Sequence, residues 1–506
     1  MHRKKVAIVG SGCSGIGALW ALQTTDHEVH LYEAKDRLGG HTNTVTFKNG
    51  NNETPVDTGF IVMNSATYPN FIAFLKQLSV QTVATQMTFG VSRDRGLFEW
   101  SGTSLSSIFA QTENVFRLGM WRLLFDVIRF NQFSLDLLAV EDEIEVIQND
   151  SSKGPSRDQR LQESIGEYLE REGYSEVFKD DYLIPMTAAV WSTSPDKCFL
   201  EFPAVTLIRF LWNHHLLSTL AARPDWLTIP AGSRTYIDAV LQDFPKERIH
   251  LDTPVLSIWN DDDGRVVLQT RQHETEVYDH VVLACHGDQV LDIVRDQATL
   301  EETDILSKFE TSRNEAVLHT DTSLMPQRSV TWSAWNYLTQ STADAKNVDK
   351  ICLTYWMNLL QHIPSDVFGP VLVTLNPLHE PDPKLTHGRW TYHHPLYNAA
   401  AIRSQKLLAN IQNTRHISYA GAWTKYGFHE DGFSSGLKVA TEHLSAKLPF
   451  EFLDSTFSRG NRPELEWKDH CVRLAITILH FWISLFAEVI GMPSRALQRQ
   501  RQKKLV

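Results

Sequence analysis

Three glycines near the start of the chain have the spacing of an anion-binding turn. Gly10, Gly12 and Gly15 follow the apolar run 5–9, KVAIV, and precede a helical pattern. The first glycine permits a tight bend, the second lets backbone approach a pyrophosphate, and the third lets helix pack on strand. Free N–H groups and the helix dipole then favour bound phosphates. The predicted contacts also include the residues between these glycines, which are Ser11, Cys13 and Ser14.

A carboxylate stands where a dinucleotide-binding unit needs one. The run 29–33, VHLYE, has the pattern of a second strand and ends at Glu33. A carboxylate at this position accepts hydrogen bonds from ribose hydroxyls. Strand, glycine turn, helix, strand and acid together predict a Rossmann-type domain that binds a dinucleotide. Glu33 and the adjacent Ala34 are expected to contact it.

The elements that position this turn continue along the chain. Residues 45–62 predict a hairpin with Asn-Gly at its turn, and three strand-like runs fall within 248–286. Alternation within 315–376 predicts an antiparallel sheet, followed by a polar helical stretch. Helical patterns surround a polar, Gly- and Pro-marked segment at 149–160, which is expected to be a surface loop.

Composition limits the class of protein. The 506 residues are 42% hydrophobic and carry a net charge of −12, which favours a globular chain of two or three domains and argues against nucleic-acid binding. The five cysteines have no paired spacing, so we expect a reducing, intracellular compartment and neither a disulfide framework nor a zinc site. The histidine pairs 214–215 and 393–394 lack metal-ligand spacing, so no metal is expected.

The residues after Glu33 carry a family resemblance. Arg37-Leu38-Gly39-Gly40 resembles the arginine and glycine-pair segment of the flavin amine oxidase superfamily. Further segments are similar to that family in its order: VDTGFIVMN (56–64), DTPVLSIW (252–259), DHVVLACH (279–286), YAGAWT (419–424) and EDGFSSG (430–436). The group that the chain most resembles is the predicted NAD/FAD-binding amine-oxidase-like proteins, through GGHTNTV, MPQRSVTWSAWNY and GAWTKYGFHEDGFSSG.

This resemblance implies that the dinucleotide is FAD. It places Gly59 and Phe60 beside the flavin ring and Val255 at the adenine. The other cofactor contacts that it implies are Arg37, Gly39, Gly40, His41, Thr42, Gly421 and Gly432. The chain departs from the family at Ala422, where relatives carry Glu, so Glu430 and Asp431 are the expected substitutes. No cysteine lies in the C-terminal motif, which favours non-covalent FAD. Residues Gly432 to Gly436 are expected to open a helix that closes the FAD site.

The expected fold class is α/β, with a discontinuous Rossmann-type FAD-binding domain and an inserted α+β substrate domain. The FAD-binding domain would take residues 1–80, 225–295 and 405–445. The substrate domain would take 81–224 and 296–404. The remaining segment, 446–506, is expected to be a tail with a hydrophobic helix at 471–491.

The expected function is an FAD-dependent oxidoreductase that removes a hydride from a small, lipophilic substrate. His429, Trp423 and Tyr426 are the catalytic candidates: a histidine can move protons near pH 7, and the two aromatics could face the flavin. The alternatives are a flavin-dependent isomerase or desaturase of fatty-acid-like substrates, an amine oxidase, a non-catalytic membrane-associated FAD-binding protein, and an NAD(P)-dependent dehydrogenase.

The C-terminal tail has three interpretations. No residue from Leu474 to Ala487 is charged, but this run is shorter than the roughly 20 residues that a membrane span needs. The segment could anchor in a membrane, lie at its interface, or dock on the protein. The basic residues of RALQRQRQKK, 495–504, would favour an anionic membrane surface.

Overall fold

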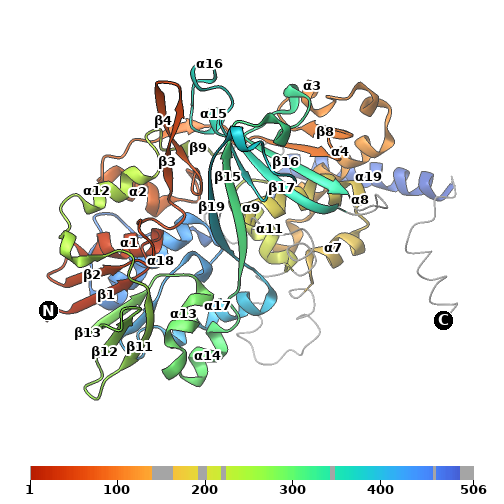
Figure 1. Cartoon of the computed structure of the whole chain (residues 1–506). Helices are drawn as coiled ribbons and strands as arrows, with labels where there is room; N and C mark the ends of the chain where they lie inside the picture. Colours follow the sequence, from red (N-terminus) through yellow and green to blue (C-terminus); the bar gives the residue numbers. More distant parts are fainter. Residues whose placement is uncertain are drawn as a thin grey trace, which may run out of the picture.

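The computed structural model of the chain describes residues 2–138, 163–191, 202–217, 224–341, 348–457, 459 and 463–489 (Figure 1). The predicted loop at 149–160 and the basic segment at 495–504 lie outside these residues.

A parallel sheet of five strands holds the N-terminal unit. Its order is β10-β2-β1-β14-β20, and all four neighbouring pairs are parallel. The predicted strand 5–9 is confirmed as β1, while the predicted 29–33 is shifted by one residue. The strands are β1 (Lys5–Val9), β2 (Glu28–Tyr32), β10 (Ile249–His250), β14 (His280–Leu283) and β20 (Ile417–Tyr419). Strands from three distant parts of the chain therefore build one Rossmann-type sheet, which confirms the α/β fold class.

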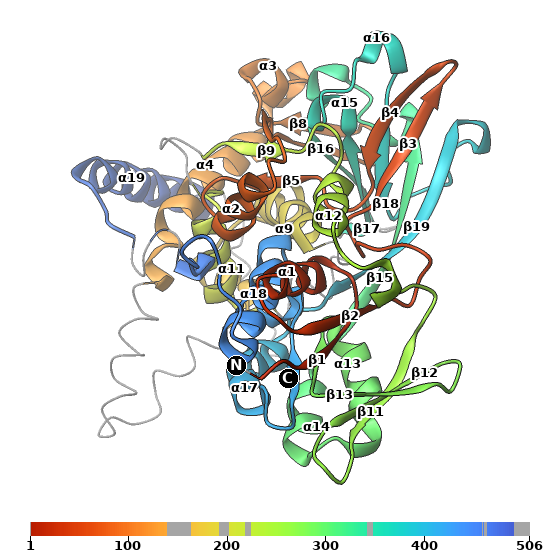
Figure 2. The same cartoon turned by 90° about the vertical axis from the view of Figure 1, so that its left-hand side faces the viewer.

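Both faces of this sheet are covered, because side chains along β1 alternate between two cores. Val6 and Ile8 pack in a core with α1 and α18, whereas Ala7 and Val9 pack in a second core below β11–β13 and α13. Figure 2 shows α1 and α18 side by side next to β1 and β2. The elements are α1 (Cys13–Leu22), α18 (His429–Leu444), α13 (Gly287–Val294), β11 (Val255–Asn260), β12 (Val266–Thr270) and β13 (Thr275–Tyr278).

A seven-stranded mixed sheet forms the second unit. Its order is β19-β15-β18-β17-β16-β7-β8, and only the β16–β7 pair is parallel. The strands are β7 (Phe89–Arg93), β8 (Phe98–Ser101), β15 (Thr311–His319), β16 (Trp335–Ser341), β17 (Val348–Trp356), β18 (Leu372–Leu375) and β19 (Thr386–Pro395). The antiparallel pairing predicted within 315–376 is confirmed.

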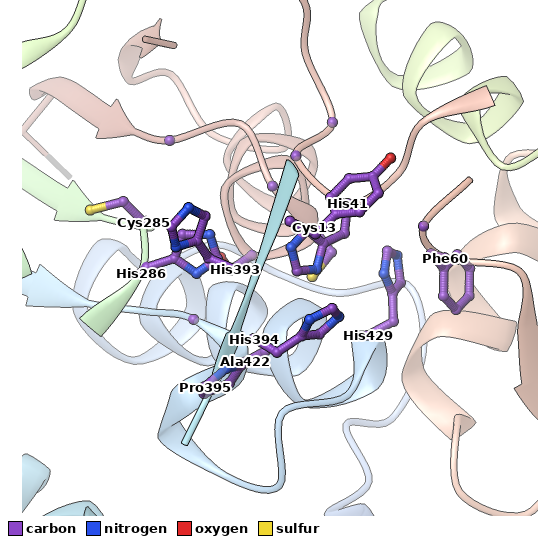
Figure 3. Close-up of a pocket in the computed structure, with 18 of the residues that line it drawn as sticks. Cys13, His41, Phe60, Cys285, His286, His393, His394, Pro395, Ala422 and His429 are labelled. Atoms are coloured by element: carbon purple, nitrogen blue, oxygen red, sulfur yellow. The ribbon is translucent and has the colours of Figure 1, made fainter. Parts of the chain in front are cut away.

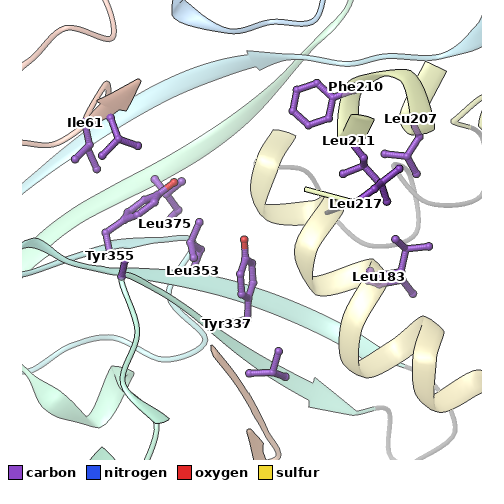
Figure 4. Packing of buried hydrophobic residues seen from close by; sticks show 14 of the residues in the cluster. Ile61, Leu183, Leu207, Phe210, Leu211, Leu217, Tyr337, Leu353, Tyr355 and Leu375 are labelled. Atoms are coloured by element: carbon purple, nitrogen blue, oxygen red, sulfur yellow. The ribbon is translucent and has the colours of Figure 1, made fainter. Parts of the chain in front are cut away.

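Helices cover one face of this second sheet. Tyr337, Leu353, Tyr355 and Leu375 project from the strands toward Phe210 and neighbouring leucines on the helices (Figure 4). The described helices with buried side chains in the core of this second sheet are α4 (Leu118–Phe133), α7 (Ile165–Glu172), α8 (Glu176–Phe178), α9 (Ile184–Trp191), α11 (Ala204–Asn213), α15 (Met357–Leu360) and α16 (Ser365–Phe368). The other described helices are α2 (Pro69–Gln77), α3 (Leu105–Ile108), α12 (Arg234–Leu241), α14 (Leu300–Leu306), α17 (Ala399–Ile411) and α19 (Trp467–Val489). The resulting core lies between sheet and helices.

Three smaller sheets complete the described structure, and one of them is the antiparallel sheet β11-β12-β13. The predicted hairpin is confirmed as β3 (Thr44–Asn49) and β4 (Asn52–Asp57), with Gly50 at φ 59° in its turn. A three-stranded sheet joins β5 (Val62–Asn64), β9 (Trp226–Thr228) and β6 (Val83–Thr85). The boundaries of the two predicted domains remain predictions.

Two sequence predictions of local structure were wrong. The stretch after 376 is not simply helical, because its polar run 386–395 forms β19 and pairs along nearly its whole length with β15. The helix of the C-terminal motif begins at His429, before Gly432. In both places a distant segment decides the local structure, which a local pattern does not reveal.

The C-terminal helix α19 begins at Trp467, four residues before the predicted start, and its neighbour is α4. Within the described residues, no helix combines the length and the apolar character that crossing a membrane requires.

Two glycines of α18 let it approach α1 very closely. A Cβ at Gly436 would lie 2.0 Å from the Ser14 carbonyl oxygen, and one at Gly432 would lie 2.5 Å from Cys13 Sγ. Any side chain at Gly436 would therefore push apart these two helices, which pack on the same face of the parallel sheet.

We predict that Gly436→Ala lowers the free energy of unfolding by about 2 kcal/mol, although alanine is the better helix former. Gly102→Ala is the matched control, since a Cβ there meets no atom within 4 Å. Urea unfolding followed by circular dichroism measures the difference. Equal stability of the two variants would contradict the close helix contact.

Candidate FAD-binding and active site

A cavity of about 810 Å³ lies between the parallel sheet and the seven-stranded sheet. Its lining begins at the turn after β1 and extends to Tyr355 and Leu375 on the second sheet. The sequence-predicted residues that line it are Gly10, Ser11, Gly12, Cys13, Ser14, Glu33, Ala34, Arg37, Gly39, Gly40, His41, Gly59, Phe60, Val255, Gly421, Trp423 and His429. The structure therefore brings most of the predicted set around one space, in which Figure 3 shows the histidines.

The glycine turn after β1 has the geometry that a pyrophosphate needs. Gly10 has φ 101°, and a Cβ there would lie 2.7 Å from the Ala284 carbonyl oxygen. A Cβ at Gly15 would lie 1.9 Å from the Gly10 carbonyl oxygen, so only glycine lets α1 pack on the turn. A Cβ added at Gly12 would meet no described atom within 4 Å, and no side chain caps the helix that follows it. The N–H groups at the start of α1 are therefore available to an anion.

Glu33 lies just past the end of β2 and anchors this turn. Its carboxylate accepts hydrogen bonds from the Ser11 backbone N–H at 3.1 Å and from the Lys35 backbone N–H at 3.0 Å. Glu33 also lines the cavity, as Val255 does. This position suits a carboxylate that faces a ribose, as the sequence predicts.

Two buried nitrogen atoms at the cavity wall lack a partner among the described residues. Arg37 donates through Nη2 to the Gly40 carbonyl oxygen at 2.9 Å, but its Nη1 has no acceptor. His41 Nε2 is also buried without a partner. Because an unsatisfied buried donor is costly, these atoms fit a bound anionic group such as the pyrophosphate of FAD. The residues present therefore fit the cofactor that the motifs imply.

A group of histidines surrounds His41. Its ring lies 5.0 Å from those of His394 and Tyr392, and 5.7 Å from that of His286. Burial lowers the pKa of His41 well below its usual value and lowers the pKa of His394 to about 4. Both rings are therefore neutral at pH 7. Among the described residues, no group of His, Cys, Asp or Glu side chains has the arrangement of a metal site.

His429 begins α18 and faces the cavity. Its ring stacks on Phe60 at 3.7 Å, and its Nε2 lies 3.1 Å from the Tyr236 hydroxyl. Burial lowers the pKa of His429 to about 3, so the imidazole is neutral at pH 7. This environment favours a positioning or hydrogen-bonding role over proton transfer near neutral pH. Its catalytic role remains a prediction.

The other two catalytic candidates have different surroundings. Trp423 is buried at the cavity wall, where its Nε1 donates to the Cys285 carbonyl oxygen at 3.0 Å and its ring packs on Phe309 at 4.5 Å. Tyr426 is not among the described lining residues and packs 6.0 Å from Phe210. The structure does not bring these two aromatics together as a pair facing the cavity.

Five predicted cofactor residues are not among the described residues that line the cavity. Glu430 accepts hydrogen bonds from the backbone N–H groups of Asn70 and Phe71 at 3.1 and 2.9 Å, which ties α2 to α18. Burial raises the pKa of Glu430 to about 7 and that of Asp431 to about 6. The predicted cofactor residues outside the described lining are Gly15, Thr42, Glu430, Asp431 and Gly432. A direct contact of the two acids with FAD, in place of the family's Glu, stays a prediction.

Sequence reasoning missed several residues that line the cavity. Phe428 stacks on Phe210 at 4.8 Å, and Tyr392 bonds Asn43 and Thr58 at the edge of the second sheet. His286, His393 and His394 also line the cavity, although the sequence considered the last two only as metal ligands. The available signal was their position after strands: His286 follows β14, and the histidine pair ends β19.

A Rossmann-type sheet with a glycine turn and an inserted mixed sheet defines a dinucleotide-binding enzyme fold. The family model of flavin containing amine oxidoreductases matches residues 13–444. The chain therefore belongs to the flavin-containing amine oxidoreductase family, as its motifs suggested. It is an FAD-dependent oxidoreductase of the amine-oxidase-like kind.

Individual comparisons agree with this family. A segment of 41 residues is 51% identical to an L-amino acid oxidase of Cerastes cerastes, and it spans 8% of this chain and 8% of that protein. A fatty acid isomerase from P. acnes has a TM-score of 0.57 at 12% identity, covering 87% of this chain and 98% of that one. A putative protoporphyrinogen oxidase from Exiguobacterium sp. 255-15 has a TM-score of 0.58 at 17% identity, covering 88% and 100%. At these identities the two structures support the fold alone.

We predict that Arg37→Gln weakens FAD binding by about 10- to 100-fold, because a cation with a buried, unpartnered Nη1 atom at the cavity wall is lost. Arg265→Gln is the matched control, since Arg265 lies at the exposed β11–β12 turn. Isothermal titration of the apoprotein with FAD measures both affinities. An unchanged dissociation constant for Arg37→Gln would show that this guanidinium does not bind the cofactor.

The lowered pKa of His429 predicts part of the acid sensitivity of the fold. In the unfolded state this histidine becomes protonated below about pH 6.5, whereas in the folded state it stays neutral down to about pH 3. The free energy of unfolding therefore falls as the pH drops below about 6.5. His429→Phe keeps the ring stack and removes the titration. Between pH 7 and pH 5, we expect the wild type to lose about 2 kcal/mol more than this variant. The other buried histidines cancel in this difference, and parallel stability curves would contradict it.

Proposed function

We propose that this oxidoreductase removes a hydride from an uncharged, lipophilic substrate while holding FAD without a covalent bond. One observation carries the proposal: among the described lining residues, those of the half of the cavity contributed by the second sheet and its helices include no Asp, Glu, Lys or Arg. The described residues of this half are Met87, Phe210, His214, Leu216, Thr311, Trp335, Tyr355, Leu375, Thr391, Tyr392, His393, His394 and Pro395.

The charged lining residues belong to the other half of the cavity. They are Glu33, Lys35, Arg37, Arg271 and Asp292, which follow strands or lie on a helix around the parallel sheet. An ion that moved from water into the second half would lose its hydration without gaining an opposite charge. An apolar substrate would instead gain by burying its surface against Phe210, Tyr355 and Leu375.

Neutral histidines supply the polar contacts at the junction of the two halves. His394 Nδ1 accepts a hydrogen bond from the Asn314 side-chain NH2 group at 2.9 Å, which orients its ring. Burial lowers the pKa of His214 to about 4, so this imidazole is also uncharged at pH 7. Such groups can orient a carbonyl, a hydroxyl or a neutral amine without demanding a charge.

The chemistry of the hydride belongs to FAD, which accepts it at the flavin ring when bound. The chain's own task is to bind, orient and exclude water. The N-terminus of α1 would hold the pyrophosphate, and the first residues of α18, Phe428 and His429, reach the cavity. The positive end of α18 would then favour negative charge that develops nearby.

Non-covalent binding is part of this proposal. Cys13 and Cys285 are the cysteines among the described lining residues, and burial raises the pKa of each thiol to about 12. Cys13 belongs to the phosphate turn and Cys285 follows β14, which are the places expected for the dinucleotide rather than for the edge of the ring. Protonated thiols at these positions do not favour a thioether link.

A flavin-dependent isomerase is the second candidate. The neighbour named a fatty acid isomerase shares this fold, and the same apolar half-cavity would accept a fatty-acid-like chain. Its reaction would return the hydride to the substrate, so turnover would continue without oxygen or another electron acceptor.

An amine oxidase that acts on a neutral amine is the third candidate function, because the family carries that name.

The test is anaerobic reduction of the bound flavin, followed as loss of its absorption band near roughly 450 nm. Lipophilic alcohols, fatty acyl compounds, primary amines and α-amino acids form the panel. We expect lipophilic uncharged compounds to bleach the band, and Leu375→Asn to weaken their apparent affinity about tenfold. Leu353→Asn, the register partner of Leu375 outside the described lining, controls for a general loss of stability.

Reduction by α-amino acids alone would overturn the proposed substrate class. Product formation under argon without an acceptor, and without net bleaching, would select the isomerase instead.

A further inference from the structure

Helix α19 packs on the protein by one face only. Arg473 Nη1 donates to Asp136 Oδ1 at 2.8 Å, and its guanidinium lies 5.1 Å from the Phe133 ring. Ile476 is buried, and the His480 ring stacks at 6.1 Å on Phe125 of α4. Residues spaced three and four apart share one face of a helix, so 473, 476 and 480 define the docked face.

The opposite face is apolar and exposed. Six apolar residues form this face, at positions 467, 474, 478, 481, 482 and 485, and their spacing places them on one stripe along the helix. These residues, each with between 40% and 71% of its surface exposed, are Trp467, Leu474, Ile478, Phe481, Trp482 and Leu485. No described residue covers this stripe, which we call the α19 apolar face.

The start of α4 enlarges this surface. Because Arg473 meets residue 136 and His480 meets residue 125, the two helices run antiparallel. The first turns of α4 therefore lie toward the C-terminal half of α19, and both views show the two helices at the edge of the molecule (Figures 1 and 2). Leu118 and Trp121 at this end of α4 are also exposed.

Leaving so much apolar surface in water is unfavourable by roughly 25 cal/mol for each Å². The α19 apolar face is therefore expected to be covered by a partner.

Three features indicate what this partner is. Tryptophan and phenylalanine favour the boundary between lipid headgroups and acyl chains. No charge interrupts α19 from Leu474 to Ala487. The sequence after Glu488 has five cations and no acid, although the whole chain has a net charge of −12; these are Arg495, Arg499, Arg501, Lys503 and Lys504.

We propose that the α19 apolar face binds an anionic lipid surface, with the helix lying in the plane of the interface. Trp467, Ile478 and Trp482 enter the boundary between headgroups and acyl chains. Arg473 and His480 stay turned toward α4, and the basic residues that follow are attracted to anionic headgroups. The helix does not cross the bilayer, which agrees with its limited apolar length.

The experiment is vesicle flotation of the full, flavin-loaded chain. Phosphatidylcholine vesicles are compared with vesicles that also contain phosphatidylserine, each at low and high salt. We expect the protein to float with the anionic vesicles, and to float less with neutral vesicles and at high salt. The double variant Ile478→Asp and Trp482→Asp should reduce the bound fraction by about tenfold or more.

Leu300→Asp is the matched control, because Leu300 is also an exposed leucine but begins α14, on a different part of the molecule. Retained flavin absorbance in each variant shows that the fold is intact, since the changed side chains are exposed. Absence of the wild type from anionic vesicles would overturn the proposal, as would flotation of the double variant at the wild-type level. A stable dimer that the double variant dissociates, without flotation, would assign the face to a second copy of the chain instead.

Discussion

The structure depends on the close contact between two helices from opposite ends of the sequence. α1 follows the glycine turn, and α18 begins more than 400 residues later, yet Gly432 and Gly436 bring its backbone against Cys13 and Ser14. At such short distances no side chain fits, so glycine is a geometric requirement here. The contact fixes both helix N-termini at the same cavity, where their free N–H groups and dipoles favour negative charge.

The contact between α1 and α18 requires that segments far apart in the sequence belong to one FAD-binding unit. A parallel sheet needs crossover connections, and the connection between β14 and β20 contains five of the seven strands of the second sheet, whereas β7 and β8 lie between β2 and β10. Because β14 and β20 are neighbours, the inserted segment leaves and returns at the same edge. The second sheet therefore stands over the carboxyl ends of the strands, which is where ligands bind in open α/β sheets.

The sequence predicts those parts of the site whose conformation is set by near neighbours in the chain, and it misses those that are placed by contacts with distant segments. The turn from Gly10 to Gly15 and the acid at Glu33 were predictable, because bends, packing and strand period are set by near neighbours. The strand β19 was not, since its polar run is ordered by pairing with β15. Gly432 suggested a helix start, but α18 begins at His429, and no local pattern encodes the close approach of Gly432 to Cys13. Phe428 and His286 were missed for the same reason.

The separation of charge along the cavity is a consequence of these two units. Charged side chains around the parallel sheet face the end where a dinucleotide carries phosphates and ribose, and they can be paired there. The second unit has a large apolar core, so a charge on its inner face would be buried without a partner. The histidines in that wall stay neutral at pH 7, because burial lowers the pKa values of His214 and His394 to about 4. The same burial that makes the wall apolar also strengthens each remaining polar contact, because little water is left to screen it. For the proposed uncharged substrate, a few neutral imidazoles would then be sufficient to orient it.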